Sequence, residues 1–559
     1  MLSKGVPMRK RLLALALLTT LACALAPSVT FADERGATPT PVTIEVGDDG
    51  APVSTSGDGW TYDNGELVLE AGYAFAFTGH AFDVSGENRI WNSGIIVDGI
   101  FVNGSKGNGS TVHNEAGGVI QGGTFNMPVN NYGTIEGGTF HESAHNHGKI
   151  AGGTFDDYVT NSEGAVVSGG VFEDGGNNNS VDNSGTIGGG EFNIGVNNSG
   201  AIEGRGVFNA YVQNGNARFG TDKNKSCTIS GGTFNSEEMD NFGTIEGGTF
   251  NGEILSRGII AGGTFSSTST VASNDEDTTD DDGGTISGGT FAGPVTNGDP
   301  DPDWNAAAIT GGTFAGAVTN YDAIGGGTFS SIVSNKEGGT VSGGMFLGDV
   351  TNRGVIEGGF FARPIIIGEG GTVSSCTFPV NASLAGLSLA GTGAEQPVAT
   401  YEKDGEESNC LTLTADTGYT LPSSVSVRLG SADGRELVSD TDYTYNDATG
   451  VVAVKKGAVA GPLFLAASGV PAIAPRTRTD APDARLPAFF VKRHASRRNR
   501  RQRAADRRRR HRALGCRDAR SKRNSLSKAP RITTVNAARR LFGHRADSFC
   551  MKALEHHAQ

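Results

Sequence analysis

The sequence has few cysteines, few aromatic residues and no long apolar run beyond its N-terminal segment. Its six cysteines form no CxxC pair, which argues against a disulfide framework and against a structural zinc site. Aromatic residues make up only 7% of the 559 residues, whereas glycine occurs 85 times, a balance that argues against one large conventional core. A short unit that repeats must therefore supply the buried surface.

The one long apolar stretch has the layout of a secretory signal. Basic residues within positions 4–11 precede the apolar run 12–26, and small residues close the segment at Ala32. Residues 1–32 are therefore predicted to be a signal peptide. No later stretch is long and apolar enough to span a bilayer. An LPxTG-like sorting signal is missing too, because neither LPSSV nor LPAFF fits that pattern, so the mode of wall attachment stays open.

Charge is divided unevenly along the chain. The formal net charge is −14, yet residues 476–559 contain 25 Lys and Arg against 6 Asp and Glu, a net charge of +19, so the rest of the chain carries −33. The region 471–559 has too little apolar content to fold, and it is predicted to be disordered or translated out of frame. Basic segments bind nucleic acid by counterion release, but no nucleic-acid partner is expected for an exported protein of otherwise acidic composition.

A heptad of the form TIEGGTF carries the repetition. It stands at 134–140 and 244–250, and looser copies fill the region from about residue 96 to 378. Every copy ends in Phe, at positions 101, 125, 140, 155, 172, 192, 208, 234, 250, 265, 291, 314, 329, 346, 361 and 378. A fixed short period indicates a solenoid, whose coils bury their apolar side chains only by stacking. We expect an all-β parallel solenoid of about sixteen short coils over residues 90–378, with Val, Ile and Phe inside and Gly-Gly at a corner.

Asparagine recurs two positions after the inward Val, so the alternation of a strand places it inside as well. These asparagines stand at 92, 114, 131, 146, 161, 183, 198, 214, 241, 297, 320, 335 and 352, with Asn274 as a weaker case. A buried amide is costly unless it is paired, and identical amides in consecutive coils pair donors with acceptors. The pattern predicts an asparagine ladder at a corner; the alternative is that Asn serves only as a turn residue.

The segments on either side of the repeats differ from them in composition. Residues 33–89 begin with a Pro-, Thr- and Gly-rich stretch that is predicted to be a linker. The Asn64-Gly65 pair then lies between alternating segments and predicts a type I′ hairpin that caps the first coil. Residues 379–470 lack double glycines and show short alternating strands such as SVSVRL, which indicate a small separate β module.

Long insertions leave the repeats after the asparagine, and two of them are acidic. They belong to successive coils, so their carboxylates are expected on one edge of the solenoid. The predicted binding edge consists of Asp275, Glu276, Asp277, Asp280, Asp281, Asp282, Asp299, Asp301, Asp303 and Trp304. Carboxylate oxygens suit Ca²⁺, but no EF-hand arrangement is present, and a solvated acidic loop is the alternative. No resident cofactor is expected.

The segment from His141 to His145 matches the HExxH pattern of zinc proteases by letters alone. That chemistry needs a helix, because only there do residues four apart share a face. Here Ala144 occupies the inward Val position and Asn146 the ladder position, so a β corner is predicted. The match is interpreted as chance, and a loose surface site shared with His147 is the alternative to solvated histidines.

The GGTF-type coils and the asparagine positions resemble right-handed parallel β-helix proteins, namely the pectate-lyase-like superfamily and the β-helical surface adhesins of bacteria. The segment GYTLP at 418–422, with the strands that follow it, resembles the Ig-like stalk modules of Gram-positive surface proteins. A right-handed solenoid is expected from the general rule for crossovers between parallel strands. The second implies that residues 379–470 are a spacer between a displayed region and the cell envelope.

These features lead to one expected function and two alternatives. We expect an exported bacterial cell-surface protein, monomeric and without catalytic activity, that acts as an adhesin toward a host glycan or matrix protein. A carbohydrate-active β-helix enzyme, either a polysaccharide lyase or a hydrolase, is the first alternative. A purely structural envelope protein is the second. Fold resemblance alone cannot assign an activity.

Overall fold

The computed structural model describes residues 38–84, 89–103, 110–176, 179–216, 227–267, 269–271, 284–300, 307–390 and 397–472. These residues fall within one compact unit, Met1–Pro475. They are almost entirely β, as predicted, with a single short 3₁₀ helix, η2 (Lys456–Ala458). No helix among them is long and apolar enough to cross a membrane.

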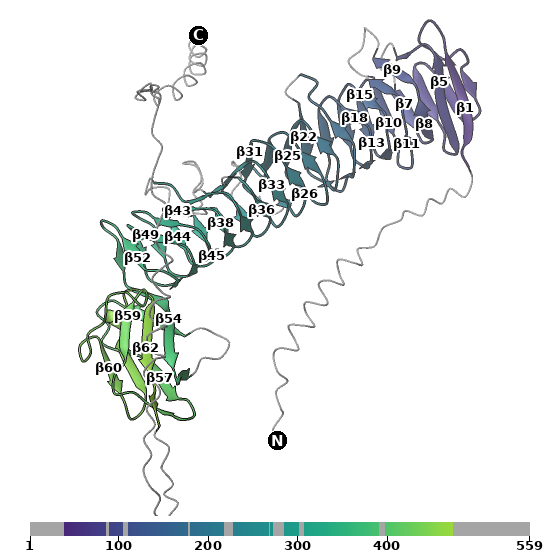
Figure 1. The fold of residues 1–559 in the computed structure, drawn as a ribbon. Helices are drawn as coiled ribbons and strands as arrows, with labels where there is room; N and C mark the ends of the chain where they lie inside the picture. Colours follow the sequence, from purple (N-terminus) through teal and green to yellow (C-terminus); the bar gives the residue numbers. More distant parts are fainter. Residues whose placement is uncertain are drawn as a thin grey trace, which may run out of the picture. The chain divides into compact units, whose positions relative to one another are not determined.

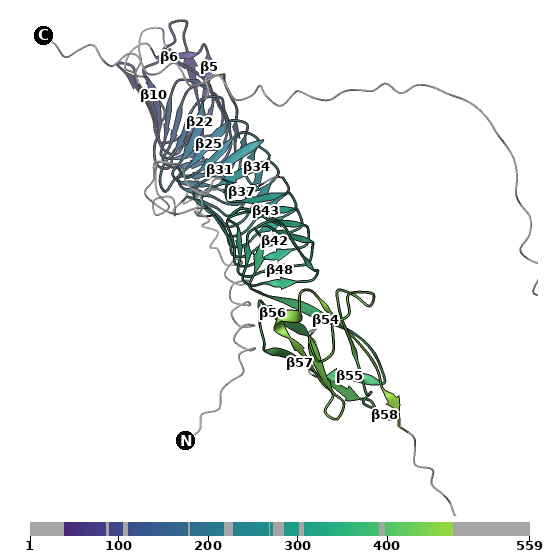
Figure 2. The same cartoon turned by 90° about the vertical axis from the view of Figure 1, so that its left-hand side faces the viewer.

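The repeats form a parallel solenoid in which each coil contributes three strands, one to each of three parallel sheets (Figures 1 and 2). We call these sheets A, B and C. One coil, for example, contains β13 (Val129–Asn131), β14 (Thr134–Ile135) and β15 (Thr139–Phe140). Within the repeats, sheet A extends from β8 (Ile95–Asp98) to β53 (Thr372–Val373), and sheet C from β9 (Ile100–Asn103) to β51 (Phe360–Phe361); strands on either side of the repeats lengthen both sheets.

Sheet B holds the Val-x-Asn strands, and every strand pairs in parallel with the next coil. Its strands are β7 (Arg89–Asn92), β10 (Thr111–Asn114), β13, β16 (Ala144–Asn146), β19 (Val159–Asn161), β22 (Ser180–Asn183), β25 (Gly195–Asn198), β28 (Val212–Asn214), β31 (Glu238–Asn241), β34 (Glu253–Ser256), β37 (Ser269–Val271), β40 (Val295–Asn297), β43 (Val318–Asn320), β46 (Val333–Asn335), β49 (Val350–Asn352) and β52 (Ile365–Ile367).

The predicted phenylalanines form one continuous stack inside the solenoid. From Phe101 to Phe361, rings of neighbouring coils lie nearly parallel, with centroids 4.6 to 5.1 Å apart. The preceding glycines make the corner possible. Gly138 has a φ of +105°, and a Cβ on Gly137 would lie 2.3 Å from the carbonyl oxygen of Gln121 in the previous coil. Both positions therefore exclude a side chain.

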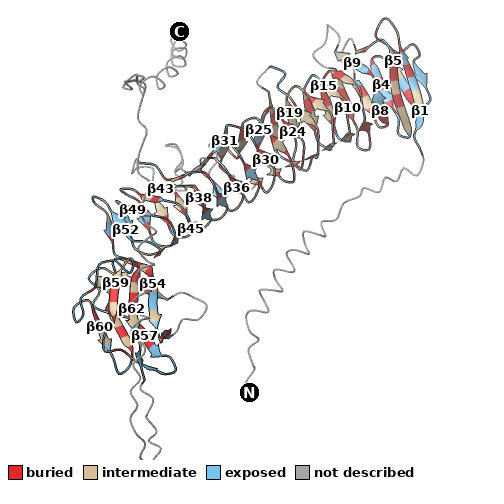
Figure 3. Ribbon diagram, in the orientation of Figure 1, coloured by how far each residue is buried: buried red, intermediate tan, exposed pale blue. Residues whose placement is uncertain are grey.

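The asparagine ladder is confirmed. Each buried Nδ2 donates to Oδ1 of the asparagine in the next coil, for instance from Asn131 to Asn146 at 2.7 Å. The first run begins at Asn92 and ends where the last amide donates to Ser256. A second run links the asparagines from Asn297 to position 352. In β13 a half-buried residue stands between two buried ones, and Figure 3 shows red and tan, the colours of buried and intermediate residues, along the solenoid.

The ladder is interrupted where the sequence predicts a weaker case. Strand register places Val271 between Ser256 and Asn297; Asn274, the weaker case of the predicted ladder, lies outside the described residues. Within the described residues, the Oδ1 atoms of Asn92 and Asn297, which begin the two runs, accept no hydrogen bond. Each run thus starts with a buried carbonyl that has no donor.

The N-terminal segment caps the first coil. Strands β3 (Trp60–Asp63) and β4 (Glu66–Leu69) form an antiparallel hairpin, and β4 extends sheet B beside β7. Asn64 and Gly65 have φ values of 48° and 87°, as a type I′ turn requires. Part of the predicted linker is instead strand β1 (Thr40–Val46), which pairs with β5 (Tyr73–Gly79). Its Ile44 and Val46 are buried. The alternation of apolar residues in this strand is short and lies among Pro and Thr, so the sequence does not indicate a strand here.

A C-terminal β module continues from the last coil through the long strand β54 (Ser375–Ala385). This strand pairs with β51, then with β56 (Val398–Glu402) and β62 (Leu463–Ser468). A second sheet contains β55 (Leu387–Ala390), β57 (Ser408–Ala415), β61 (Val451–Lys455) and β60 (Tyr443–Asn446). The remaining strands are β58 (Tyr419–Thr420), β59 (Ser426–Leu429) and β63 (Val470–Pro471).

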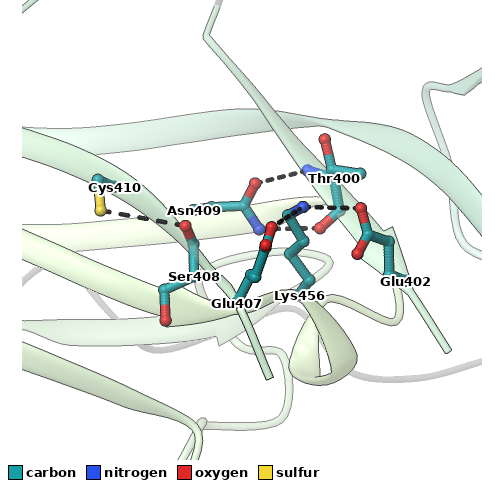
Figure 4. Close-up of polar contacts among 7 residues, drawn as sticks. All are labelled: Thr400, Glu402, Glu407, Ser408, Asn409, Cys410 and Lys456. Carbon is teal, nitrogen blue, oxygen red and sulfur yellow. Dashed lines mark hydrogen bonds and ion pairs between the residues drawn. The ribbon is translucent and has the colours of Figure 1, made fainter. Parts of the chain in front are cut away.

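Polar contacts join the strands of this module to η2 (Figure 4). The Lys456 ammonium donates to Glu402 at 2.7 Å and to Glu407 at 2.8 Å. These hydrogen bonds raise the pKa of Lys456 and lower the pKa of Glu407. The Asn409 amide pairs with the backbone N–H and carbonyl of Thr400, at 2.9 and 2.8 Å. These groups satisfy one another's hydrogen bonds, and the contacts stabilise the module.

Candidate functional site

The predicted acidic edge lies almost wholly outside the described residues. Of its ten members, only Asp299 is described, and it is exposed. The predicted positions 275–277, 280–282, 301, 303 and 304 lie in parts of the chain that the structure does not describe. The acidic edge stays a prediction, and the site developed below rests on other residues.

The HExxH segment is a β corner, as predicted. Ala144 and Asn146 point inward and are buried, while the three histidines contact different neighbours. His141 Nδ1 lies 2.6 Å from Asp156 and His145 Nδ1 lies 2.9 Å from Thr160. Across the described ranges, no group of three or more His, Cys, Asp or Glu side chains has the arrangement of a metal site.

The outward side of sheet B carries the most varied side chains of the solenoid. The residue between the inward Val and the inward Asn points away from the core, because side chains alternate along a strand. The strand register places these residues in one row: Trp91, His113, Asn130, His145, Thr160, Asp182, Asn197, Gln213 and Asp240. We call this row, with Tyr158 and Tyr211 beside it, the outer strip. At about 4.8 Å per coil it is roughly 38 Å long.

An aromatic pair begins the strip. The Trp91 and His113 rings stack with centroids 4.4 Å apart and an interplanar angle of 18°. Burial, with a smaller contribution from the Arg89 charge, lowers the pKa of His113. Burial and the neighbouring His147 likewise lower the pKa of His145. Both imidazoles are therefore neutral at pH 7, and they present aromatic faces and hydrogen-bonding nitrogens rather than charge.

Two tyrosine–aspartate pairs follow further along the strip. The Tyr158 hydroxyl donates to Asp182 in the next coil, and the Tyr211 hydroxyl donates to Asp240 at 2.7 Å. Burial, then the bond to Asp182, raise the pKa of Tyr158 to about 12. Burial, then the bond to Asp240, raise the pKa of Tyr211 as well. Both hydroxyls therefore stay protonated and hold their carboxylates in place.

Amide and hydroxyl groups connect to the first of these pairs. Oδ1 of Asp182 accepts from Asn197 Nδ2 at 2.8 Å and from Ser180 Oγ at 3.1 Å. Asn197 is exposed, and the Tyr211 side chain keeps 40% of its surface exposed. The strip thus combines ring faces with oriented donors and acceptors, the composition that favours recognition of polar ligands.

The strip ends after Asp240. At the matching outward position, the next coils carry Leu255, Thr270, Thr296, Thr319, Ser334, Thr351 and Ile366. None of these is aromatic or charged. Recognition chemistry is therefore concentrated in the N-terminal half of sheet B.

A second regular surface lies on sheet C, where the residue after Phe points outward. Asn251, Asn235, Asn209 and Asn193 form an amide row in which each Nδ2 donates to the asparagine of the preceding coil at 2.8 to 3.0 Å, and the last, Asn193, donates to Glu173 at 3.1 Å. Threonines occupy the outward position before Phe in six consecutive coils, from Thr233 to position 328. The asparagine and threonine side chains are small and uncharged, and the amide row ends at the carboxylate of Glu173.

Comparisons with family models, with curated proteins and with solved structures find no match for this chain.

Proposed function

We propose that this chain is an exported bacterial surface protein that acts as a non-catalytic adhesin, with the outer strip as its binding face for an extended glycan. The observation that carries the proposal is the alignment of Trp91, Tyr158 and Tyr211 with hydrogen-bonding side chains on one sheet face. Aromatic faces attract the polarised C–H groups of sugars, and amides and carboxylates bind their hydroxyls. The signal-like N-terminus supports export.

The parallel architecture suits such a role. Each coil repeats the same backbone at a fixed spacing, so side chains from many coils lie in one straight row. A linear ligand can contact several coils at once without any cavity. The resemblance of residues 379–470 to stalk modules supports display away from the cell envelope.

A carbohydrate-active enzyme is the second candidate. The observation that favours it is a group of carboxylates, because Glu238 and Asp240 share strand β31 and Glu253 lies in register with Glu238 on β34. Hydrolysis by paired carboxylates usually requires one carboxyl group in an apolar, enclosed setting. Both glutamates are exposed, which favours binding over catalysis.

A binding screen of the full chain tests the proposal. Immobilised host glycans and matrix proteins are probed with the wild type and with Tyr211→Ala, and Leu255→Ala, two coils further along the same sheet, is the matched control. Glycan binding that Tyr211→Ala lowers and Leu255→Ala leaves unchanged is the expected result. Release of reducing ends or unsaturated products, abolished by Glu238→Gln, would instead establish the enzyme.

A further inference from the structure

The two tyrosine–aspartate pairs repeat one geometry. In each, the tyrosine directly precedes an inward Val, and the aspartate directly follows the inward residue of the next coil. Tyr158 pairs with Asp182 in this way, and Tyr211 pairs with Asp240. The coils that carry the two aspartates, β22 and β31, are three steps apart in the parallel register. The pairs are therefore about 14 Å apart along the strip.

A purely structural role does not account for everything about these pairs. Oδ1 of Asp240 is buried and accepts no hydrogen bond within the described residues. A buried carboxylate oxygen without a donor is costly, so packing alone does not explain why an aspartate stands here. The Tyr211 ring beside it keeps 40% of its surface exposed, so an apolar face lies open to a ligand next to the pair.

The charges near the second pair restrict the ligand. Glu238 lies beside Asp240 on β31, and Glu253 is in register with Glu238 on the next strand. The nearby Arg257 guanidinium lies over the Phe242 ring, 5.4 Å from its centroid. Like charges side by side repel an acidic ligand as well as each other, so uronates and sulfated sugars are disfavoured.

Resting on the function proposed above, we propose that the two tyrosine–aspartate pairs are two subsites for one linear glycan without acidic groups. At each subsite the tyrosine ring packs against a sugar face, and an exposed polar side chain beside the pair, Asn197 at the first and Glu238 at the second, binds a sugar hydroxyl. A chain shorter than the spacing occupies the subsites independently, whereas a longer chain binds both. Binding at the second subsite then becomes intramolecular, and affinity rises without any new kind of contact.

Calorimetry with the full chain tests this inference. The probes are uncharged β-1,4-glucan, β-1,3-glucan and N-acetylglucosamine oligomers from dimer to octamer, with oligogalacturonates as the acidic counterpart. We expect a short oligomer that binds to show two sites per chain, and Tyr158→Ala or Tyr211→Ala to reduce this to one. We expect the octamer to bind once, and either variant to weaken it by about 10²-fold or more, the loss of avidity that linked sites allow. Oligogalacturonates should bind at least tenfold more weakly.

Matched variants separate recognition from folding. Tyr211→Phe keeps the ring, so it should retain most short-oligomer affinity, while thermal unfolding reports any loss of the cross-coil hydrogen bond. Affinity that is independent of chain length, or unchanged by both alanine variants, would refute the subsites but leave glycan binding intact. Equal binding of oligogalacturonates would refute the charge preference. Failure of every oligomer to bind would refute the proposed function together with this inference.

Discussion

Replacing one buried asparagine of the ladder should destabilise the solenoid strongly. In the wild type, Asn161 accepts from Asn146 and donates to Asn183, both at 2.7 Å, within the core. Asn161→Leu keeps the branched shape of the side chain but removes both ladder bonds, and it leaves one buried amide donor and one buried carbonyl without their ladder partners. Each unsatisfied group costs about 1–3 kcal/mol, so the free energy of unfolding should fall by about 2–6 kcal/mol.

Urea unfolding of the full chain, followed by circular dichroism, measures this loss. Asn235→Ala is the matched control, because it interrupts an amide row of the same geometry that is exposed to water. Water replaces its lost hydrogen bonds, and the change should stay within about 0.5 kcal/mol. If both variants lost the same free energy of unfolding, the ladder would owe its stabilising effect to amide pairing as such and not to burial, and the reasoning would be refuted.

Three further predictions follow from the same structure. Val271→Asn should join the two ladder runs by donating to the free carbonyl of Asn297, and it should raise the free energy of unfolding by about 1–2 kcal/mol in urea titrations. Acidification should destabilise the chain below about pH 6.5, the pKa of histidine in the unfolded state. The reason is that folding lowers the pKa values of His113 and His145, so the unfolded state binds these protons first as the pH falls. Replacing both histidines by Gln should flatten this pH dependence in thermal melts. Gly138→Ala should cost about 1–3 kcal/mol in the same melts, because its φ of +105° is unfavourable for a side chain.

The scaffold could be predicted from the sequence because the core imposes its period on the chain. Phe140, Asn146 and their counterparts must face inward at fixed intervals, so spacing alone identifies the ring stack and the ladder. The same logic fails where a segment lacks the period. Strand β1 has only three apolar residues among Pro and Thr. Val271 occupies a ladder position in the strand register, but no asparagine marks that position in the sequence.

The outer strip could not be predicted in this way, because outward positions are free of the packing constraint. Tyr158 and Asp182 stand 24 residues apart, and Tyr211 and Asp240 stand 29 apart, since inserted loops vary in length. A linear search for spaced motifs therefore passes over them. Alignment of the coils on the inward Val would have brought them together, and this signal was present in the sequence.

If the outer strip is the binding face, two triple variants of the full chain should differ in glycan binding. One carries Trp91→Ala, Tyr158→Ala and Tyr211→Ala. The other carries Thr296→Ala, Thr319→Ala and Ser334→Ala on the same sheet beyond the strip. Calorimetric titration with the best oligosaccharide should show binding lost in the first and unchanged in the second. Undiminished binding by the first variant, with its fold intact by circular dichroism, would contradict the claim.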